Sequence, residues 1–93
     1  LREVKLPDTI KYIGQSAFEG CDALTKITIG NGVMHISENA FKGCSSLKKI
    51  VLPSSVLQIE DGAFDECDEL VIKCERNSFA EQYCQENNIQ YVV

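Results

Sequence analysis

A period of 23 residues runs through the chain and constrains its fold more than any other feature. Cys21, Cys44 and Cys67 stand 23 residues apart, and leucine, isoleucine and an Ala-Phe pair recur at the same interval. We call the residues at one place in successive units a column, and eight columns are apolar throughout. A unit this short cannot bury its own apolar side, so it must stack on copies of itself. The period therefore predicts a solenoid.

The chain divides into three complete units and a remainder that departs from the period. The units are residues 1–23, 24–46 and 47–69, and the remainder is residues 70–93. Leu70 keeps the register, but Ile72 and Cys74 come one residue early, which indicates a deletion. We expect all 93 residues to form one domain, because a single core commonly takes about 50–200 residues.

Each unit opens with an alternation that is typical of a β-strand. In the second unit we expect Ile27 to face inward while Lys26 and Thr28 face out. Proline or glycine then ends the strand, at Pro7, Gly30 and Pro53. A shorter extended stretch is expected near the thirteenth place, and the A-F-x-x-C segment is expected to be a turn or one helical turn. The stacked strands should form one parallel sheet on one side of the stack.

The residues from 70 to 93 predict a cap that closes the stack. Ser78 and Glu81 match an S-x-x-E capping box, which predicts the start of a helix. Phe79 and Tyr83 stand four residues apart and would share one face of that helix. An exit and a final strand are expected after the helix, at Asn87-Asn88 and at Ile89, Tyr91 and Val93. A cap of this kind stops further copies from stacking on the open end.

The units resemble the BspA-like class of leucine-rich repeats found on bacterial surface proteins. The resemblance rests on L-x-x-I-x-L-P, then I-G, then A-F-x-x-C, and it covers essentially the whole chain. It implies an α/β-type leucine-rich repeat solenoid, mostly β with irregular turns, with a parallel sheet on one side and a helix–strand cap. It also implies a secreted or cell-surface bacterial protein that binds protein or glycan ligands. The motif encodes the scaffold, so it assigns no functional residue.

The chain departs from the motif in its connecting segments and has no cap at its beginning. Gly30 stands where the motif has proline, and Ser37 and Glu60 stand where it has glycine. We expect these departures to change local turn geometry and not the fold. Because no cap precedes Leu1, we expect the chain to be the C-terminal part of a longer array, and its first coil to allow end-to-end self-association.

Composition and charge argue against two classes of partner. With 44% hydrophobic and 25% charged residues, the chain has the average composition of a soluble globular domain. No apolar run approaches the roughly 20 residues of a membrane helix, so we expect no membrane insertion. The net charge is −5, with 9 Lys+Arg against 14 Asp+Glu, whereas nucleic-acid binding needs a concentrated basic surface. We therefore expect no nucleic-acid partner.

The five cysteines invite a metal or disulfide interpretation, but packing is favoured. No C-x-x-C pair occurs, and the chain has one histidine, so the ligand spacing of a zinc site is missing. Side chains in register along a stack have poor geometry for disulfides. We expect Cys21, Cys44 and Cys67 to be buried thiols that fill small core positions. Packing is also favoured for Cys74 and Cys84, with a disulfide in the cap as the alternative.

Catalytic chemistry has little support in the sequence. His35 falls at an outward place beside Tyr12 and Gln58, where a solvated residue is expected. The acidic residues that gather near the end of the third unit are Glu60, Asp61, Asp65, Glu66, Asp68 and Glu69. They predict a solvated turn edge, with weak calcium binding as an alternative, although no D-x-D-x-D-G loop is present. No phosphate loop or nucleophile elbow occurs, so we expect no enzyme, no cofactor and no metal.

The distribution of charge within the unit gives the clearest functional prediction. Basic residues, Arg2 among them, concentrate on the strand segments and acidic residues in the turns after the Ala-Phe pair. The outward residues form two columns, Glu3, Lys26 and Lys49 in one and Lys5, Thr28, Val51 and Lys73 in the other. The candidate partner-binding residues are Lys5, Lys26, Thr28, Lys48, Lys49, Val51 and Lys73. Such a stripe would steer an acidic protein partner, unless the lysines only keep an exposed sheet soluble.

Two functions follow from these expectations. The favoured one is a non-catalytic interaction or adhesion module that binds protein or glycan. The alternative is a passive spacer that holds another domain away from the cell wall. A second surface, the apolar column of Met34 and Leu57 next to Val51, would be exposed if the middle of the shorter stretch faces out, but it is small for a docking patch.

Overall fold

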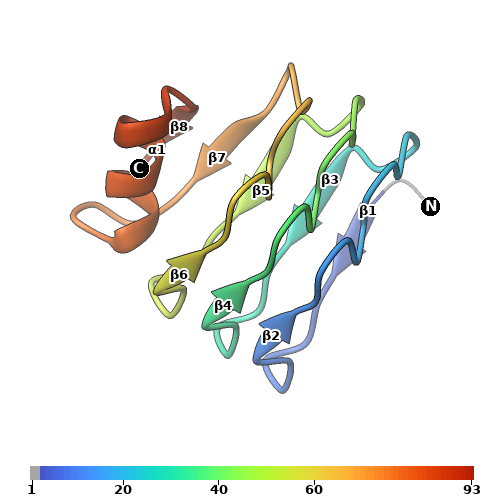
Figure 1. The fold of residues 1–93 in the computed structure, drawn as a ribbon. Helices are drawn as coiled ribbons and strands as arrows, with labels where there is room; N and C mark the ends of the chain where they lie inside the picture. The colour runs from blue at the N-terminus through green and yellow to red at the C-terminus, as the bar shows by residue number, and fades with distance from the viewer. Residues whose placement is uncertain (1–2) are drawn as a thin grey trace.

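Strands at the start of each coil form the larger of two parallel sheets. The computed structural model describes residues 3–93, and predictions that fall on Leu1 and Arg2 lie outside the described residues. The larger sheet contains β1 (Glu3–Lys5), β3 (Lys26–Thr28), β5 (Lys49–Val51), β7 (Val71–Lys73) and β8 (Gln90–Val92). They lie side by side in that order, as the coils do along the stack (Figure 1). About four turns of a solenoid result, as the period predicts.

A second sheet forms on another side of the stack, which corrects the expectation of one sheet. Its strands are β2 (Tyr12–Ile13), β4 (His35–Ile36) and β6 (Gln58–Ile59), all parallel. The short extended stretch of each coil is in register with the next, so its backbone groups pair between coils. Sequence periodicity predicted the extended stretches, but it could not predict that two residues per coil would suffice to pair.

The turns that carry the A-F-x-x-C segment also stack by backbone hydrogen bonds. The N–H of Phe18 donates to Ala40 O at 2.8 Å, and the N–H of Phe41 donates to Ala63 O at 2.8 Å. These segments are turns, as expected, with no helix of their own. Every side of the coil is therefore tied to its neighbour through the backbone.

The apolar columns fill the space between these three sets of stacked segments. Ile27, Ile50 and Ile72 are fully buried in successive strands of the larger sheet. The rings of Phe18, Phe41 and Phe64 stack at centroid distances of 5.3 and 5.4 Å with parallel planes. Stacked aromatic rings add to the stabilisation that their burial gives.

The cap has the predicted helix and final strand. Helix α1 (Phe79–Asn87) begins after Ser78, whose hydroxyl accepts the N–H of Glu81 at 3.2 Å. The Glu81 carboxylate accepts the N–H of Asn77, one residue before the position that a standard capping box uses. Asn88, with φ 56°, ends the helix in the left-handed conformation. Figure 1 shows α1 at the end of the stack opposite the N-terminus.

The predicted deletion is confirmed by the strand register. Ile50 pairs with Ile72, and Val51 pairs with Lys73, which places partners 22 residues apart instead of 23. The shortened connection still brings β7 into the larger sheet. β8 then adds a fifth parallel strand, with Ile72 opposite Tyr91.

All five cysteines are free, but two are less buried than expected. Cys44, Cys74 and Cys84 are buried, whereas Cys21 and Cys67 are half-buried. Cys21 lies at an uncovered side of the first coil, where it lines an apolar hollow with Val4 and Phe18. Cys67 borders a hollow between its turn and the cap. The Sγ atoms of Cys44 and Cys67 lie 3.0 and 3.1 Å from carbonyl oxygens of the preceding coil, so these thiols hydrogen-bond as well as pack.

Candidate partner-binding face

The outer face of the five-stranded sheet carries six of the seven candidate residues. Strand register places Lys26 beside Lys49, with Glu3 before them in that column and Val71 and Gln90 after them. The adjacent column contains Lys5, Thr28, Val51 and Lys73, as the period predicts. Lys48, the seventh residue, is exposed and directly precedes β5. Strand pairing thus brings residues from four coils onto one surface, which we call the strand face.

Among residues 3–93, no lysine of the strand face forms an ion pair within 4.0 Å, although Glu3 lies beside Lys26 in the strand register. Within the same residues, the one contact below 4.0 Å between a basic and an acidic side chain joins His35 and Glu60, at the smaller sheet. Neighbouring strands lie about 4.8 Å apart, so Lys26 and Lys49 raise the local positive potential together. The face is therefore basic on a chain whose net charge is −5.

A groove of about 410 Å³ runs along the edge of the strand face where the strands end. One wall consists of Lys5, Thr28, Val51 and Lys73, and the other of Asp8, Asn31, Pro53 and Glu75. Ile29 and Leu52, both buried, lie between the walls. The 23-residue period contains no signal for this groove, because its second wall depends on how the following turns are placed. Four of the seven candidate residues line it.

Gly30 explains why the groove wall can form at the second coil. A side chain at Gly30 would come within 2.7 Å of Pro7 O and 2.8 Å of Leu6 O, in the backbone of the first coil. Glycine instead of the motif's proline thus allows the two coils to approach closely at this turn. Asn31 N–H then donates to the Asp8 carboxylate at 2.9 Å and fixes the rim. The departure changes the turn and leaves the fold intact, as expected.

His35 lies on the smaller sheet and is less exposed than expected for a solvated residue. Its Nε2 donates to Glu60 Oε2 at 2.9 Å, and both side chains are half-buried. The difference arises because Glu60, which replaces the motif's glycine, reaches back to the preceding coil. Tyr12, His35 and Gln58 do form one column, as predicted.

The remaining candidate features fall elsewhere on the surface. Asp61, Asp65, Glu66, Asp68 and Glu69 are exposed, as predicted for a turn edge. Within the described part of the chain, no group of three or more His, Cys, Asp or Glu side chains could hold a metal ion. Met34 and Leu57 are exposed by 43% and 67%, as predicted, but they flank the smaller sheet, whereas Val51 lies in the larger one.

The thiols of Cys67 and Cys84 are poor nucleophiles at neutral pH. Burial raises the pKa of Cys67 to about 11 and that of Cys84 to about 12. Thiolates are the reactive form of cysteine, so both side chains remain in the unreactive thiol form. None of the described helices is both long and apolar enough to cross a membrane. The strand face thus combines lysines that form no ion pair among residues 3–93 with a groove along its edge.

Stacked coils of this kind, each contributing one strand to a parallel sheet, define a leucine-rich repeat solenoid. The chain belongs to the BspA type leucine rich repeat family, whose model matches residues 1–92. No curated protein is significantly similar to the chain.

A solved structure shares this fold. It is a leucine rich cell surface protein of Faecalibacterium prausnitzii A2-165, with 29% sequence identity and a TM-score of 0.71. The match covers 97% of this chain and 29% of that protein chain. The chain therefore spans less than a third of the length of that surface protein chain.

Proposed function

We propose that the chain is a non-catalytic protein-interaction module of a secreted or cell-surface protein, and that it binds an acidic, extended segment of a partner protein. The observation that carries the proposal is the set of unpaired lysines on the strand face, beside a groove that spans four coils. Membership in a leucine-rich repeat family and the likeness to a cell surface protein support the class and the location. Residues 1–69 would supply the repeats and residues 70–93 the cap.

The spacing of the strands sets the shape of the bound segment. Lys5 and Lys73 lie three strand positions apart in one column, which corresponds to about 14 Å at the usual strand spacing. An extended chain covers that distance in about four residues. A segment running along the stack would thus place two carboxylates about four residues apart, with an apolar residue between them against Val51. Lys26 and Lys49 would steer it to the face.

Charge reversal on the strand face tests this proposal. The probe is a synthetic peptide with two glutamates about four residues apart around one valine, compared with a peptide in which lysines replace the glutamates. We expect Lys26→Glu/Lys49→Glu to weaken binding of the acidic peptide about tenfold or more, mainly through slower association. Fluorescence anisotropy at two salt concentrations measures the affinity and its screening.

A matched control separates the strand face from net charge. Lys11→Glu/Lys42→Glu makes the same change in net charge on residues outside the larger sheet, and we expect it to leave the affinity nearly unchanged. Equal losses in both double variants would contradict a specific face. If the unchanged chain bound neither peptide, the result would favour a passive spacer.

The uncovered side of the first coil supports a second contact, with another copy of the chain. Val4, Leu6 and Phe18 are half-buried there, whereas Ile27, Ile29 and Phe41 in the second coil are buried. End-to-end pairing of this 93-residue chain would cover those side chains. Light scattering across a concentration series tests it, and a constant monomer mass would contradict it.

A further inference from the structure

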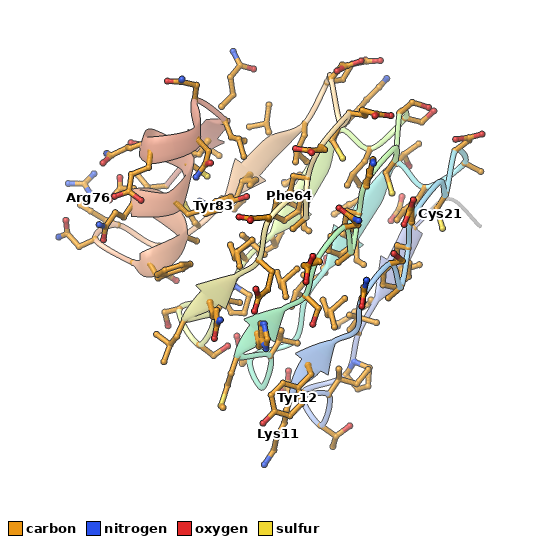
Figure 2. The ribbon with its side chains drawn as sticks, in the orientation of Figure 1. Lys11, Tyr12, Cys21, Phe64, Arg76 and Tyr83 are labelled. Carbon is orange, nitrogen blue, oxygen red and sulfur yellow. The ribbon has the colours of Figure 1, made fainter. Side chains whose placement is uncertain are left out.

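The outer face of the three-stranded sheet carries an aromatic side chain beside a hydrogen-bonded polar group. Tyr12, His35 and Gln58 lie in one column across β2, β4 and β6. Tyr12 is 62% exposed, and Figure 2 shows it at the outer edge of β2, directed away from the core. The His35 ring lies 6.3 Å from the Tyr12 ring, and the two planes are nearly perpendicular at 82°. The Tyr12 ring is thus held beside a second ring and remains open to solvent.

Glu60 fixes the polar side chains next to Tyr12. Its Oε2 accepts hydrogen bonds from His35 Nε2 and Gln58 Nε2, both at 2.9 Å. A carboxylate only accepts, so His35 carries its proton on Nε2 and leaves Nδ1 free in the neutral form. Among residues 3–93, no hydrogen bond is formed by Glu60 Oε1, Gln58 Oε1 or His35 Nδ1. Two acceptor oxygens, joined by Nδ1 when His35 is neutral, are therefore positioned in advance and have no partner among the described residues.

The surface next to the Tyr12 ring is open. Gly14 follows on the same outer side of the coil, and an added side chain there would meet no atom within 4 Å. Ser37 and Glu60 occupy the equivalent places in the next two coils. This second column therefore has no side chain in the coil of Tyr12 and a glutamate side chain in the coil of Gln58. A flat molecule could lie against Tyr12 and reach His35 and Glu60 at its edge.

An aromatic ring with planar polar groups at its edge matches the chemistry of a sugar ring. One face of a pyranose presents C–H groups, which pack on an aromatic ring as apolar surface does. Its hydroxyl groups at the ring edge are donors, and the free atoms of His35, Gln58 and Glu60 are acceptors. The Glu60 carboxylate would repel an acidic ligand, so this face differs from the basic strand face.

We propose that Tyr12, His35, Gln58 and Glu60 form a binding site for a neutral saccharide, with Tyr12 as the stacking platform. The site is shallow and has one platform, so a single site binds at millimolar concentration. The saccharide site lies on the three-stranded sheet, whereas the strand face belongs to the five-stranded sheet, and the two share no residue. It is therefore independent of the proposed binding of an acidic segment.

A titration followed by two-dimensional amide NMR tests the site on the whole 93-residue chain. The probes are neutral tetrasaccharides of glucose, mannose, galactose and N-acetylglucosamine, each raised to millimolar concentration. We expect at least one of them to shift the amide signals of residues 12–14, 35–37 and 58–60 in a saturable way. Tyr12→Ala should weaken that binding about tenfold, while Tyr12→Phe, which keeps the ring, should change it by about twofold or less.

Two further variants keep the result interpretable. Glu60→Gln keeps the side-chain length but replaces one acceptor oxygen with a donor, and we expect about a threefold loss of affinity. Lys26→Glu/Lys49→Glu, on the strand face, should leave saccharide binding unchanged. The proposal is overturned if no tetrasaccharide shifts these signals, or if Tyr12→Ala binds as well as Tyr12→Phe. It is also overturned if a protein partner occupies this face through Leu57 while saccharides do not bind.

Discussion

The two ends of the stack follow the same repeat and differ in how well their apolar columns are covered. In the first coil Phe18 is half-buried and Ala17 is exposed, whereas Phe64 and Ala63 in the third coil are buried. The difference arises from Tyr83, whose ring meets that of Phe64 edge-on at 6.2 Å and belongs to the cap. Figure 2 shows Tyr83 directed toward Phe64 from α1. Equivalent phenylalanines in one column are therefore stabilised to different extents, because full burial requires a neighbour on each side.

The largest expected effect compares two members of the phenylalanine column. Phe41→Ala removes a fully buried ring that stacks on both neighbours, and we expect it to lower the free energy of unfolding by about 3–5 kcal/mol. Phe18→Ala removes a half-buried ring with one stacked neighbour and should cost roughly 1–2 kcal/mol. Urea unfolding measures both.

Phe41→Leu provides a milder variant if Phe41→Ala does not fold. Its loss should still exceed that of Phe18→Leu. Equal losses of unfolding free energy at the two positions would show that the place of a phenylalanine along the stack does not determine how much its burial stabilises the chain.

The second prediction concerns alkaline pH and the closed end. Burial raises the pKa of Cys67 to about 11 and of Cys84 and Tyr83 to about 12, and all three lie near or in the cap. An unfolded thiol ionises near pH 9.0, so above that pH the unfolded state releases protons that the native state keeps. Stability is therefore full below about pH 9 and falls as the pH rises, by roughly 2 kcal/mol between pH 8 and pH 10.

Urea unfolding at these two pH values measures the loss. Cys67→Ala/Cys84→Ala removes both thiols and should flatten the dependence on pH, even though it lowers stability at every pH. Amide hydrogen exchange should show that α1 loses protection before β3. If the double variant lost as much stability between pH 8 and pH 10 as the unchanged chain, groups other than these two thiols would be responsible for the loss.

The smallest expected effect favours the first coil over the third. At the same turn position the first coil has glycine and the third has glutamate, and the backbone there has positive φ in both. Gly20, Gly43 and Glu66 occupy one column, and all three have positive φ, at 72°, 75° and 63°. A residue with a side chain is strained in that conformation, so Glu66→Gly should stabilise the chain by about 1 kcal/mol. Gly20→Ala, which meets no atom within 4 Å, should destabilise it by a similar amount. Thermal unfolding compares the two, and a destabilising Glu66→Gly would contradict the argument.

Much of the fold was predictable because each apolar column repeats. Identical spacing forces Ile27 and Ile50 to share a layer, and the early position of Ile72 predicted the changed register of β7. The helix was predictable from Ser78 and Glu81, since capping is local. The strand face was predictable to the level of which residues share a column. Its groove was not, because the second wall consists of turns whose approach depends on Gly30.

The polar features that escaped prediction all involve contacts between coils. Glu60 was predicted to be a solvated turn residue, yet its carboxylate reaches His35 in the preceding coil. Cys21 was predicted to be buried, yet nothing in the described chain covers that side of the first coil. A period states which residues are equivalent, but it does not state how long side chains cross from one coil to the next.

The sequence by itself determined that this chain is a stack of 23-residue coils with a cap, and which residues face outward in each column. Periodic apolar residues fix this, because a short unit has no other way to remove them from water. Only the tertiary structure decided that a second sheet forms, that a groove follows the strand face, and that Tyr12, His35 and Glu60 meet on one surface. Those features depend on distances between coils and on side-chain conformations, which the period leaves open.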